Sequence, residues 1–247
     1  MTKLGIEPYQ KTTKNFPSLI RFSTMQEPSS LVTLIIIIVT GIVTFQGFKK
    51  PELFNRLMFD NHAITHKKEY ERLLTSALLH ASWMHFAFNM FSLYSFGNYI
   101  ELIYSPAVLL LIYLVSILGG DILSLIFYKN THYRAVGASG GVCGVIYASI
   151  FLLPGGSIYI LPIPFAIPSW IYAILFLLIS AYGMRSAKGN IGHIAHIGGA
   201  LTGLATTFLM FPKKVLALPE LLGLIILISV AVLGYELYRK QKQPGQI

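Results

Sequence analysis

Long apolar runs make up most of this chain, and they constrain its fold more than any other feature. The first run, residues 31–48, contains no charged residue. Inside a lipid bilayer, backbone N–H and C=O groups must find their partners within the protein, and a helix achieves this within one segment. Only 12% of the 247 residues are charged, against about 25% in soluble domains. The sequence therefore predicts an all-α, multi-pass integral membrane protein.

The apolar runs predict seven transmembrane segments. They are residues 31–48, 80–103, 107–128, 139–153, 170–184, 192–211 and 219–238. The first six form one expected membrane domain, residues 29–212, after a polar N-terminal tail, residues 1–28. Residues 213–247 add the seventh helix and a basic tail. No cleavable signal peptide is expected, because the tail lacks a short apolar core followed by a small-residue cleavage site.

The loop after the first segment, residues 49–79, is long and carries apolar residues at helical spacing. This pattern predicts a partly structured element in the membrane interface. The net charge of +9 resides mostly in tails and loops, which favours contact with lipid headgroups over nucleic acid. The distribution of Lys and Arg over the loops leaves the sidedness open, and the sequence does not indicate an oligomeric state.

A serine between glycines, Ser139, begins the fourth segment. This segment has about 15 residues and spans about 22 Å, less than the bilayer core of about 30 Å. A short helix among longer ones would place its first residue in a depression below the surface. A serine hydroxyl needs a neighbouring base to act as a nucleophile. The best candidate is His196, 57 residues later in the sixth segment.

Other polar residues within the apolar segments are candidates for function, because polar groups are costly in lipid. His85 and Asn89 in the second segment are four residues apart and share a helix face. Asp121 in the third segment has no evident partner. Small residues in the fourth and sixth segments allow these two helices to approach closely; they are Gly140, Gly141, Gly144, Gly199 and Gly203.

Together these residues suggest a serine–histidine dyad. His196 would take the proton of Ser139 and return it to the leaving amine after attack on a peptide carbonyl. His85, Asn89 and backbone N–H groups at the start of the fourth helix would stabilise the oxyanion. Each residue taken alone also fits ordinary helix packing or an interhelical hydrogen bond. Metal chemistry is not expected, because the zinc-protease pattern H-E-x-x-H is absent from the sequence.

The combination resembles the rhomboid family of intramembrane serine proteases. Three motifs carry the resemblance, namely Gly137-Ala138-Ser139-Gly140, Ala195-His196-Ile197-Gly198-Gly199 and the His85-x-x-x-Asn89 pair. The resemblance covers roughly residues 31–212. It implies Ser139 as nucleophile, His196 as base, His85 and Asn89 as oxyanion donors, and no cofactor. It also implies that the partners are membrane lipids and transmembrane protein substrates. The seventh segment resembles the 6+1 layout of some members.

Two further expectations rest on this resemblance. Arg72 stands where the family's loop arginine ends a tryptophan–arginine pair, and Glu101 has the spacing of the acid that pairs with it. We therefore expect an Arg72–Glu101 pair to hold the first loop on the bundle. Cys143 occupies a position where many relatives have an aromatic residue that stacks on the histidine. Gly137, Gly140, Gly199 and Gly203 are expected to support the site.

Three functions are compatible with these observations. The first is a serine endopeptidase in a bacterial inner membrane. The second is a catalytically silent rhomboid-like scaffold that binds membrane helices, although such relatives typically lack the serine or the histidine. The third is a transporter, for which a symmetric pair of broken helices would be expected. Only the fourth segment is short and rich in glycine, so the sequence favours the protease.

Overall fold

The computed structural model describes residues 30–160, 165–183 and 193–242, and the expected N-terminal tail lies outside these ranges. Each predicted segment corresponds to one helix, with ends that differ by up to four residues from the prediction. The helices are α1 (Leu31–Lys49), α5 (Trp83–Ile103), α6 (Pro106–Phe127), α7 (Ser139–Leu152), α8 (Ser169–Gly183), α9 (His193–Met210) and α11 (Pro219–Lys242). The all-α fold predicted from the apolar runs is confirmed.

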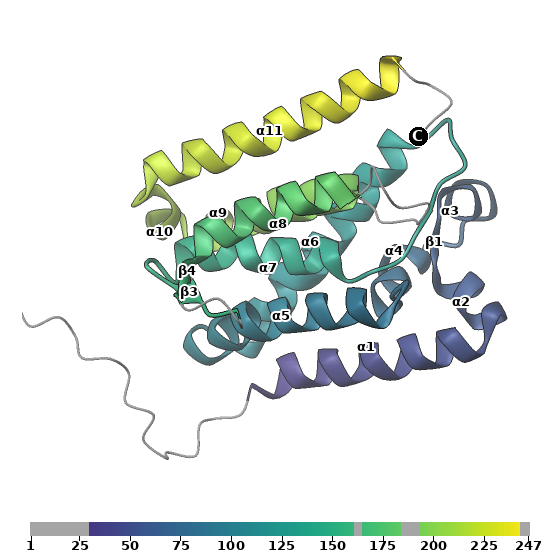
Figure 1. Cartoon of the computed structure of the whole chain (residues 1–247), viewed down its shortest axis with the longest axis horizontal. Coiled ribbons are helices and arrows are strands. Elements are labelled where there is room, and N and C mark those ends of the chain that lie inside the picture. Colours follow the sequence, from purple (N-terminus) through teal and green to yellow (C-terminus); the bar gives the residue numbers. More distant parts are fainter. Residues whose placement is uncertain (1–29, 161–164, 184–192, 243–247) are drawn as a thin grey trace, which may run out of the picture.

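Three of the described helices are long and apolar enough to cross a membrane, namely α1, α6 and α11. The apolar helix α7 is shorter, and so is the apolar stretch Ile194–Met210 of α9. The count of seven membrane crossings therefore stays a prediction. Figure 1 shows α1 and α11 at opposite edges of the bundle, with α7 between them.

Helices α5 and α6 each begin after a serine that satisfies one of their first backbone N–H groups. Ser82 accepts a hydrogen bond from the backbone of His85 at the start of α5 (3.1 Å), and Ser105 accepts one from Val108 at the start of α6 (3.3 Å). Pro106 follows Ser105 as the first residue of α6, where proline's missing N–H costs nothing. These caps fix where α5 and α6 begin.

The long first loop is folded into short helices. They are α2 (Pro51–Leu57), α3 (Asn61–Lys67), α4 (Arg72–Thr75) and the 3₁₀ turn η1 (Ser76–Leu78). The expectation of a partly structured element is confirmed, and its place in the membrane interface stays a prediction. Strand β1 (Phe59–Asp60) pairs antiparallel with β2 (Arg134–Ala135), which ties this loop to the segment before α7. The remaining described elements are β3 (Ser157–Ile158), β4 (Ile167–Pro168) and α10 (Pro212–Leu216).

The core of the bundle is α7, and every one of its residues is buried. Its first turns pack against α6 and α9 through glycines. A Cβ added to Gly199 would overlap the carbonyl of Gly140, and one added to Gly203 would overlap the backbone of Gly144. Because no side chain separates the backbones, α7 and α9 approach closely. The small-residue contact predicted from the sequence is confirmed.

Helices α1 and α5 lie side by side and antiparallel, so the start of α1 meets the end of α5. There the buried Glu101 accepts hydrogen bonds from the backbone N–H groups of Val32 and Thr33 (2.8 Å each) and from the Thr33 hydroxyl (2.7 Å). The carboxylate thus caps α1 and complements the positive end of its dipole.

The expected pair between Arg72 and Glu101 is wrong. Glu101 lies near the end of α5, about 27 Å along the helix axis from its first residue. Arg72 lies in the loop that precedes the other end of α5, and it donates to Glu69 instead (2.6 Å). The spacing of the two residues along the chain does not show that nearly the whole length of α5 lies between them.

Loss of the Glu101 cap should destabilise the bundle. Glu101→Ala leaves buried donors of α1 without an acceptor and should lower the free energy of unfolding by about 1–3 kcal/mol. Denaturation of the detergent-solubilised protein, followed by circular dichroism, measures this change. Glu220→Ala is the matched control, because Glu220 is exposed in the first turn of α11. Its effect should stay within about 0.5 kcal/mol. Equal effects of the two substitutions would contradict the capping role.

Candidate active site

Ser139 is the first residue of α7 and is buried to 6% exposure. It follows a tight turn in which Gly137 has a φ of 134°, a conformation that favours glycine. His196 lies in the first turn of α9 and is 2% exposed. Its Nε2 is hydrogen-bonded to the Oγ of Ser139. The fold thus brings together the two residues that the sequence analysis singled out.

His85 borders the same space as Ser139. A Cβ built on Gly137 would lie 2.7 Å from His85 Cε1, 3.1 Å from His85 Nε2 and 3.6 Å from Ser139 Oγ. Any side chain at position 137 would therefore collide with the imidazole. Glycine is required there both for its backbone angle and for the approach of His85.

Asn89 lies one turn after His85 on α5, as the four-residue spacing predicts. It is buried, and its Nδ2 donates to the carbonyl of His85 (3.0 Å). One N–H of this amide remains for another acceptor, because an NH₂ group has two donors. Among the described residues, Asn89 Oδ1 has no hydrogen-bond partner.

His80 supports His85 from behind. The two rings are 4.9 Å apart between centroids and meet edge to face. Thr44 Oγ1 donates to the carbonyl of Leu78 (3.1 Å) and also contacts His80 Nδ1 (3.2 Å). The contact with Thr44 orients the ring of His80.

An aromatic residue that the sequence analysis missed lies beside His196. The ring of Phe176, on α8, is 6.1 Å from the imidazole between centroids, in an edge-to-face arrangement. Phe88 on α5 also stacks on Phe176, with the ring centroids 5.2 Å apart. Cys143, where the resemblance led us to look for an aromatic, is buried in the core. Nothing in the apolar sequence of α8 distinguishes Phe176 from its neighbours, so only the packing identifies it.

Asp121 also has a partner that the sequence did not indicate. Its Oδ2 accepts a hydrogen bond from Ser76 Oγ (2.9 Å) across the gap between α6 and η1. The carbonyl of Ser76 in turn accepts from the N–H of Gly137 (3.1 Å). One serine thus connects α6, the first loop and the turn that precedes Ser139.

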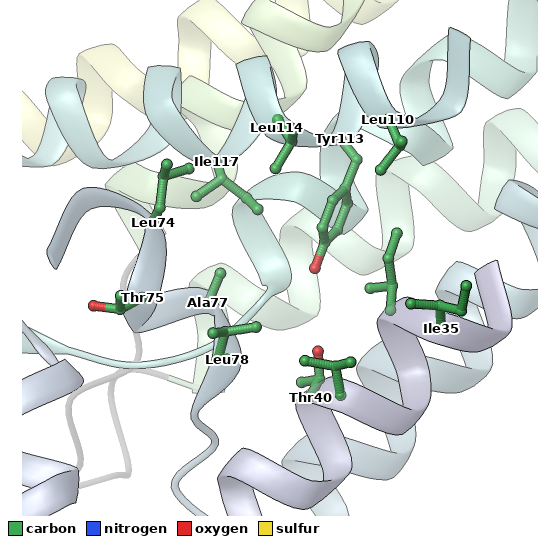
Figure 2. Close-up of a pocket in the computed structure, with 12 residues that line it drawn as sticks. Ile35, Thr40, Leu74, Thr75, Ala77, Leu78, Leu110, Tyr113, Leu114 and Ile117 are labelled. Atoms are coloured by element: carbon green, nitrogen blue, oxygen red, sulfur yellow. The ribbon is translucent and has the colours of Figure 1, made fainter. Parts of the chain in front are cut away.

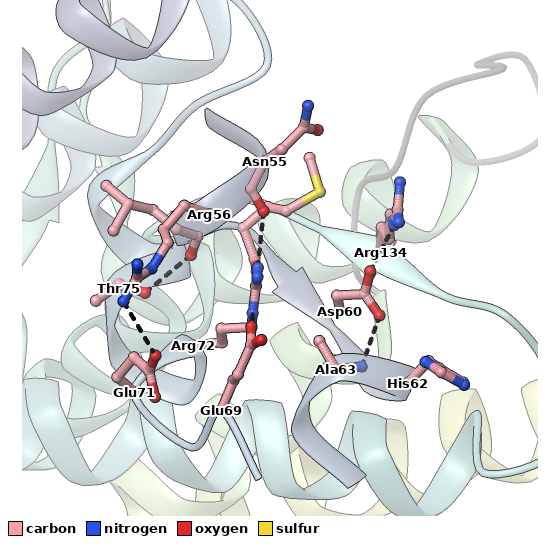
Figure 3. A network of polar contacts seen from close by, with 12 residues as sticks. Asn55, Arg56, Asp60, His62, Ala63, Glu69, Glu71, Arg72, Thr75 and Arg134 are labelled. Atoms are coloured by element: carbon pink, nitrogen blue, oxygen red, sulfur yellow. Dashed lines mark hydrogen bonds and ion pairs between the residues drawn. The ribbon is translucent and has the colours of Figure 1, made fainter. Parts of the chain in front are cut away.

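Arg72 holds the first loop together from inside. Its guanidinium donates to Glu69 and to the carbonyls of Asn55 and Met58 (2.8 and 2.7 Å), as Figure 3 shows. These contacts join α2, the segment before β1 and α4. Arg72 therefore supports the loop's own structure, in place of the expected bond to the bundle.

Asp60 connects the first loop to the segment before α7. Its carboxylate caps α3 at the N–H of Ala63 (3.0 Å) and forms an ion pair with Arg134 on β2 (2.7 Å). Burial alone would raise the pKa of Asp60. The Ala63 amide and the Arg134 guanidinium more than offset this and hold the pKa below its ordinary value of 3.8.

The comparisons with known proteins identify the family of this chain. The family model of the Rhomboid domain matches residues 67–213, which include α5 to α9. The chain belongs to the rhomboid family. Together with its apolar helices, this makes it an integral membrane protein.

Several rhomboid proteins of bacteria and plants are similar to this chain. Rhomboid protease GluP of Bacillus subtilis is 33% identical over 183 residues, which are 72% of this chain and 34% of that protein. RHOMBOID-like protein 2 of Arabidopsis thaliana is 35% identical over 185 residues, which are 70% of this chain and 55% of that protein. RHOMBOID-like protein 6, mitochondrial, of the same plant is 36% identical over 142 residues, 56% of this chain and 43% of that protein. The matches thus span only part of these rhomboid relatives, and mitochondrial proteins are among them.

Within the described part of this rhomboid domain, no three His, Cys, Asp or Glu side chains are grouped so that they could hold a metal ion. His193, the first residue of α9, has a side chain outside the described set. The fold thus gathers a serine hydroxyl, an imidazole and further polar side chains around Ser139.

Acid should weaken the attachment of the first loop through Asp60. The pKa of Asp60 is lower in the folded state than in the unfolded state, so its stabilising effect is complete above pH 3.8. It is lost as the pH falls through the lower folded-state value. The free energy of unfolding, followed from neutral pH to below pH 3.8, should fall less steeply in Asp60→Asn than in the wild type. Glu52→Gln, at an exposed carboxylate of α2, should leave the slope unchanged. Identical slopes for Asp60→Asn and the wild type would exclude this contribution.

Proposed function

We propose that this rhomboid protein is an intramembrane serine endopeptidase that cleaves transmembrane proteins in or near a membrane helix. The observation that carries the proposal is the hydrogen bond between His196 Nε2 and Ser139 Oγ at the buried start of α7. A histidine in this contact can take the hydroxyl proton, which a lone serine cannot release at neutral pH. The name of the relative GluP, a rhomboid protease, supports the same chemistry.

The first step forms the acyl-enzyme. His196 Nε2 accepts the proton of Ser139 while Oγ attacks the carbonyl carbon of the scissile peptide. The imidazolium then gives this proton to the departing amine, and the C–N bond breaks. Water then reacts in the same way. His196 takes a proton from water, and the resulting hydroxide attacks the carbonyl carbon of the acyl ester. Ser139 then leaves and regains its proton from His196.

The oxyanion formed in each step needs hydrogen-bond donors. His85 Nε2 faces the space beside Gly137 and Ser139, and Asn89 has one amide N–H beyond its bond to His85. Backbone N–H groups at the start of α7 add the positive end of a helix dipole. We assign His85 and Asn89 to oxyanion stabilisation on this basis.

The glycines act by allowing this assembly. Gly140 and Gly199 have no side chains that would separate α7 from α9, and the same holds for Gly203 one turn further along α9. Gly137 leaves room for His85. We further propose that the membrane domain has the six helices α1, α5, α6, α7, α8 and α9, and that α11 is an additional seventh crossing.

The alternative from another class is a rhomboid scaffold that binds membrane helices without cleaving them. It would require that Ser139 be unreactive despite its contact with His196. The hydrogen bond between the two side chains favours the enzyme, because a scaffold has no need of it.

Reaction with a fluorophosphonate tests the proposed nucleophile. The purified protein in detergent should be labelled at Ser139, as located by mass spectrometry, and His196→Ala should abolish the label while the protein stays folded. Ser149→Ala is a matched control, because Ser149 is a second buried serine of α7 and should not affect labelling. Labelling of Ser139 that persists in His196→Ala would contradict the dyad. A folded wild type that neither reacts nor cleaves a transmembrane substrate would support the scaffold.

Asn89→Ala tests the oxyanion assignment. The remaining donors share the negative charge, so the turnover rate should fall by about 100-fold or less, with a smaller effect on KM. Asn98→Ala serves as control, since Asn98 is half-buried further along α5 and away from His85. Unchanged kinetics in Asn89→Ala would remove Asn89 from the oxyanion site. Cleavage of a reconstituted transmembrane substrate, measured under single-turnover conditions, gives the rate.

A further inference from the structure

A cavity of about 280 Å³ lies between α1, the loop residues 74–78 and α6 (Figure 2). It lies outside the arrangement around Ser139 and His196 described above. The side chains that line it are almost entirely aliphatic; they are Ile35, Ile36, Val39 and Thr40 of α1, Leu74, Thr75, Ala77 and Leu78 of the loop, and Leu110, Tyr113, Leu114 and Ile117 of α6.

Two helices that are long and apolar enough to cross a membrane, α1 and α6, line the cavity, and we take its mouth to lie between their exposed residues. Its rim residues are strongly exposed: Ile35 is 56%, Val39 42% and Leu114 43% exposed. On transmembrane helices such residues face lipid hydrocarbon and not water. The medium next to the mouth is therefore the acyl-chain region of the bilayer.

The floor of the cavity is deep in the protein. Ala77 is 2% exposed and Thr40 is fully buried. Thr40 Oγ1 has no hydrogen-bond partner among the described residues. Figure 2 shows Ala77 next to Leu78 on the loop and Thr40 on α1, with the hydroxyl of Tyr113 pointing toward Thr40.

Water fits most of this space poorly. An ordered water needs two to four polar partners, and beyond the hydroxyls of Thr40 and Tyr113 the wall is almost wholly apolar. An apolar cavity of about 150 Å³ is enough to bind benzene. A flexible hydrocarbon chain can fill the larger space here and restore the dispersion contacts of its walls.

We infer that this cavity is a binding site for one acyl chain of a membrane lipid. The chain enters between α1 and α6 and ends against Ala77 and Thr40. The occupant is set by the apolar lining, by the volume and by the rim on two lipid-facing helices.

An occupied site would support the proposed active site from behind. Tyr113 and Ile117 form one wall of the cavity and also fill the space over Gly141, two residues after Ser139. Ser76 lies between the lining residues Thr75 and Ala77, and its carbonyl and hydroxyl bind Gly137 and Asp121. An acyl chain in the cavity holds both walls in place. This effect of the acyl chain on the proposed active site rests on the proposed function, whereas the binding of the acyl chain does not.

Photolabelling tests the site directly. The full-length protein is reconstituted in phosphatidylcholine vesicles that contain a trace of phosphatidylcholine with a diazirine in the middle of one acyl chain. After irradiation, labelled residues are located by peptide fragmentation. Label is expected on the buried Ala77 and the half-buried Leu78, both of which line the cavity, and also on the exposed Ile126 at the protein surface. Label on Ile126 without label on residues 77 and 78 would overturn the inference.

Two substitutions on one helix provide the matched pair. Val39→Phe narrows the cavity from its rim, whereas Ile38→Phe places the same ring at an exposed position outside the lining. Label on residues 77 and 78 should be lost in Val39→Phe and retained in Ile38→Phe. Ala77→Leu, which fills the floor, should remove the label from Leu78. Retention of the label in both Val39→Phe and Ala77→Leu would contradict the proposed path.

The effect of the bound acyl chain on the turn before Ser139 is measured separately. Phosphatidylcholine added to delipidated protein in detergent should slow hydrogen exchange of the Gly137 amide, whose acceptor is Ser76. This slowing should be absent in Val39→Phe. Ser139→Ala should be labelled like the wild type and show the same slowing, so a failure of the protease proposal remains distinguishable from a failure of this one. Exchange that is equally fast with and without lipid would overturn the coupling.

Discussion

The arrangement around Ser139 depends on the direct contact of two helix backbones. Lipid is as apolar as the helices, so there is little hydrophobic force between them, and close packing must hold them together. In this protein, α7 and α9 achieve this where Gly140 meets Gly199 and Gly144 meets Gly203. The hydrogen bond from Ser139 to His196 spans these two helices and has a short reach. This hydrogen bond can therefore form only because the neighbouring glycines leave no side chain between the two backbones.

Polar groups complete what the glycines begin. In the described part of the bundle, several buried polar side chains connect elements that lie far apart in sequence. Glu101 caps α1 from the end of α5, Ser76 connects α6 to the turn before Ser139, and Thr44 fixes His80 behind His85. An unsatisfied polar group is costly in an apolar interior, so each of these contacts is strongly specified. The first loop is thereby attached to the bundle at Ser76 and at Asp60, close to the proposed active site.

These attachments favour a first loop that stays in place while the protein functions. Arg72 cross-links the loop internally, and the β1–β2 pair joins it to the segment before α7. In the proposed protease, a rigid loop would keep Gly137 and His85 in register for each oxyanion. The acyl-chain cavity lies under the same loop, so the composition of the bilayer would act on its stability.

The sequence by itself determined where the helices lie and which residues are candidates for chemistry. The backbone of an apolar run in lipid must form its hydrogen bonds within the run, so the helices follow from hydropathy alone. The motifs around Ser139, His196 and His85 stand out because polar groups are rare within apolar segments. The tertiary structure alone decided which groups face each other. Glu101 caps α1 and does not meet Arg72, Asp121 binds Ser76, and Phe176 lies against His196. Helical periodicity gives the face on which a residue lies, but the partner on that face depends on how neighbouring helices are oriented and offset. That choice is made by packing contacts between residues distant in the chain, which no local pattern records.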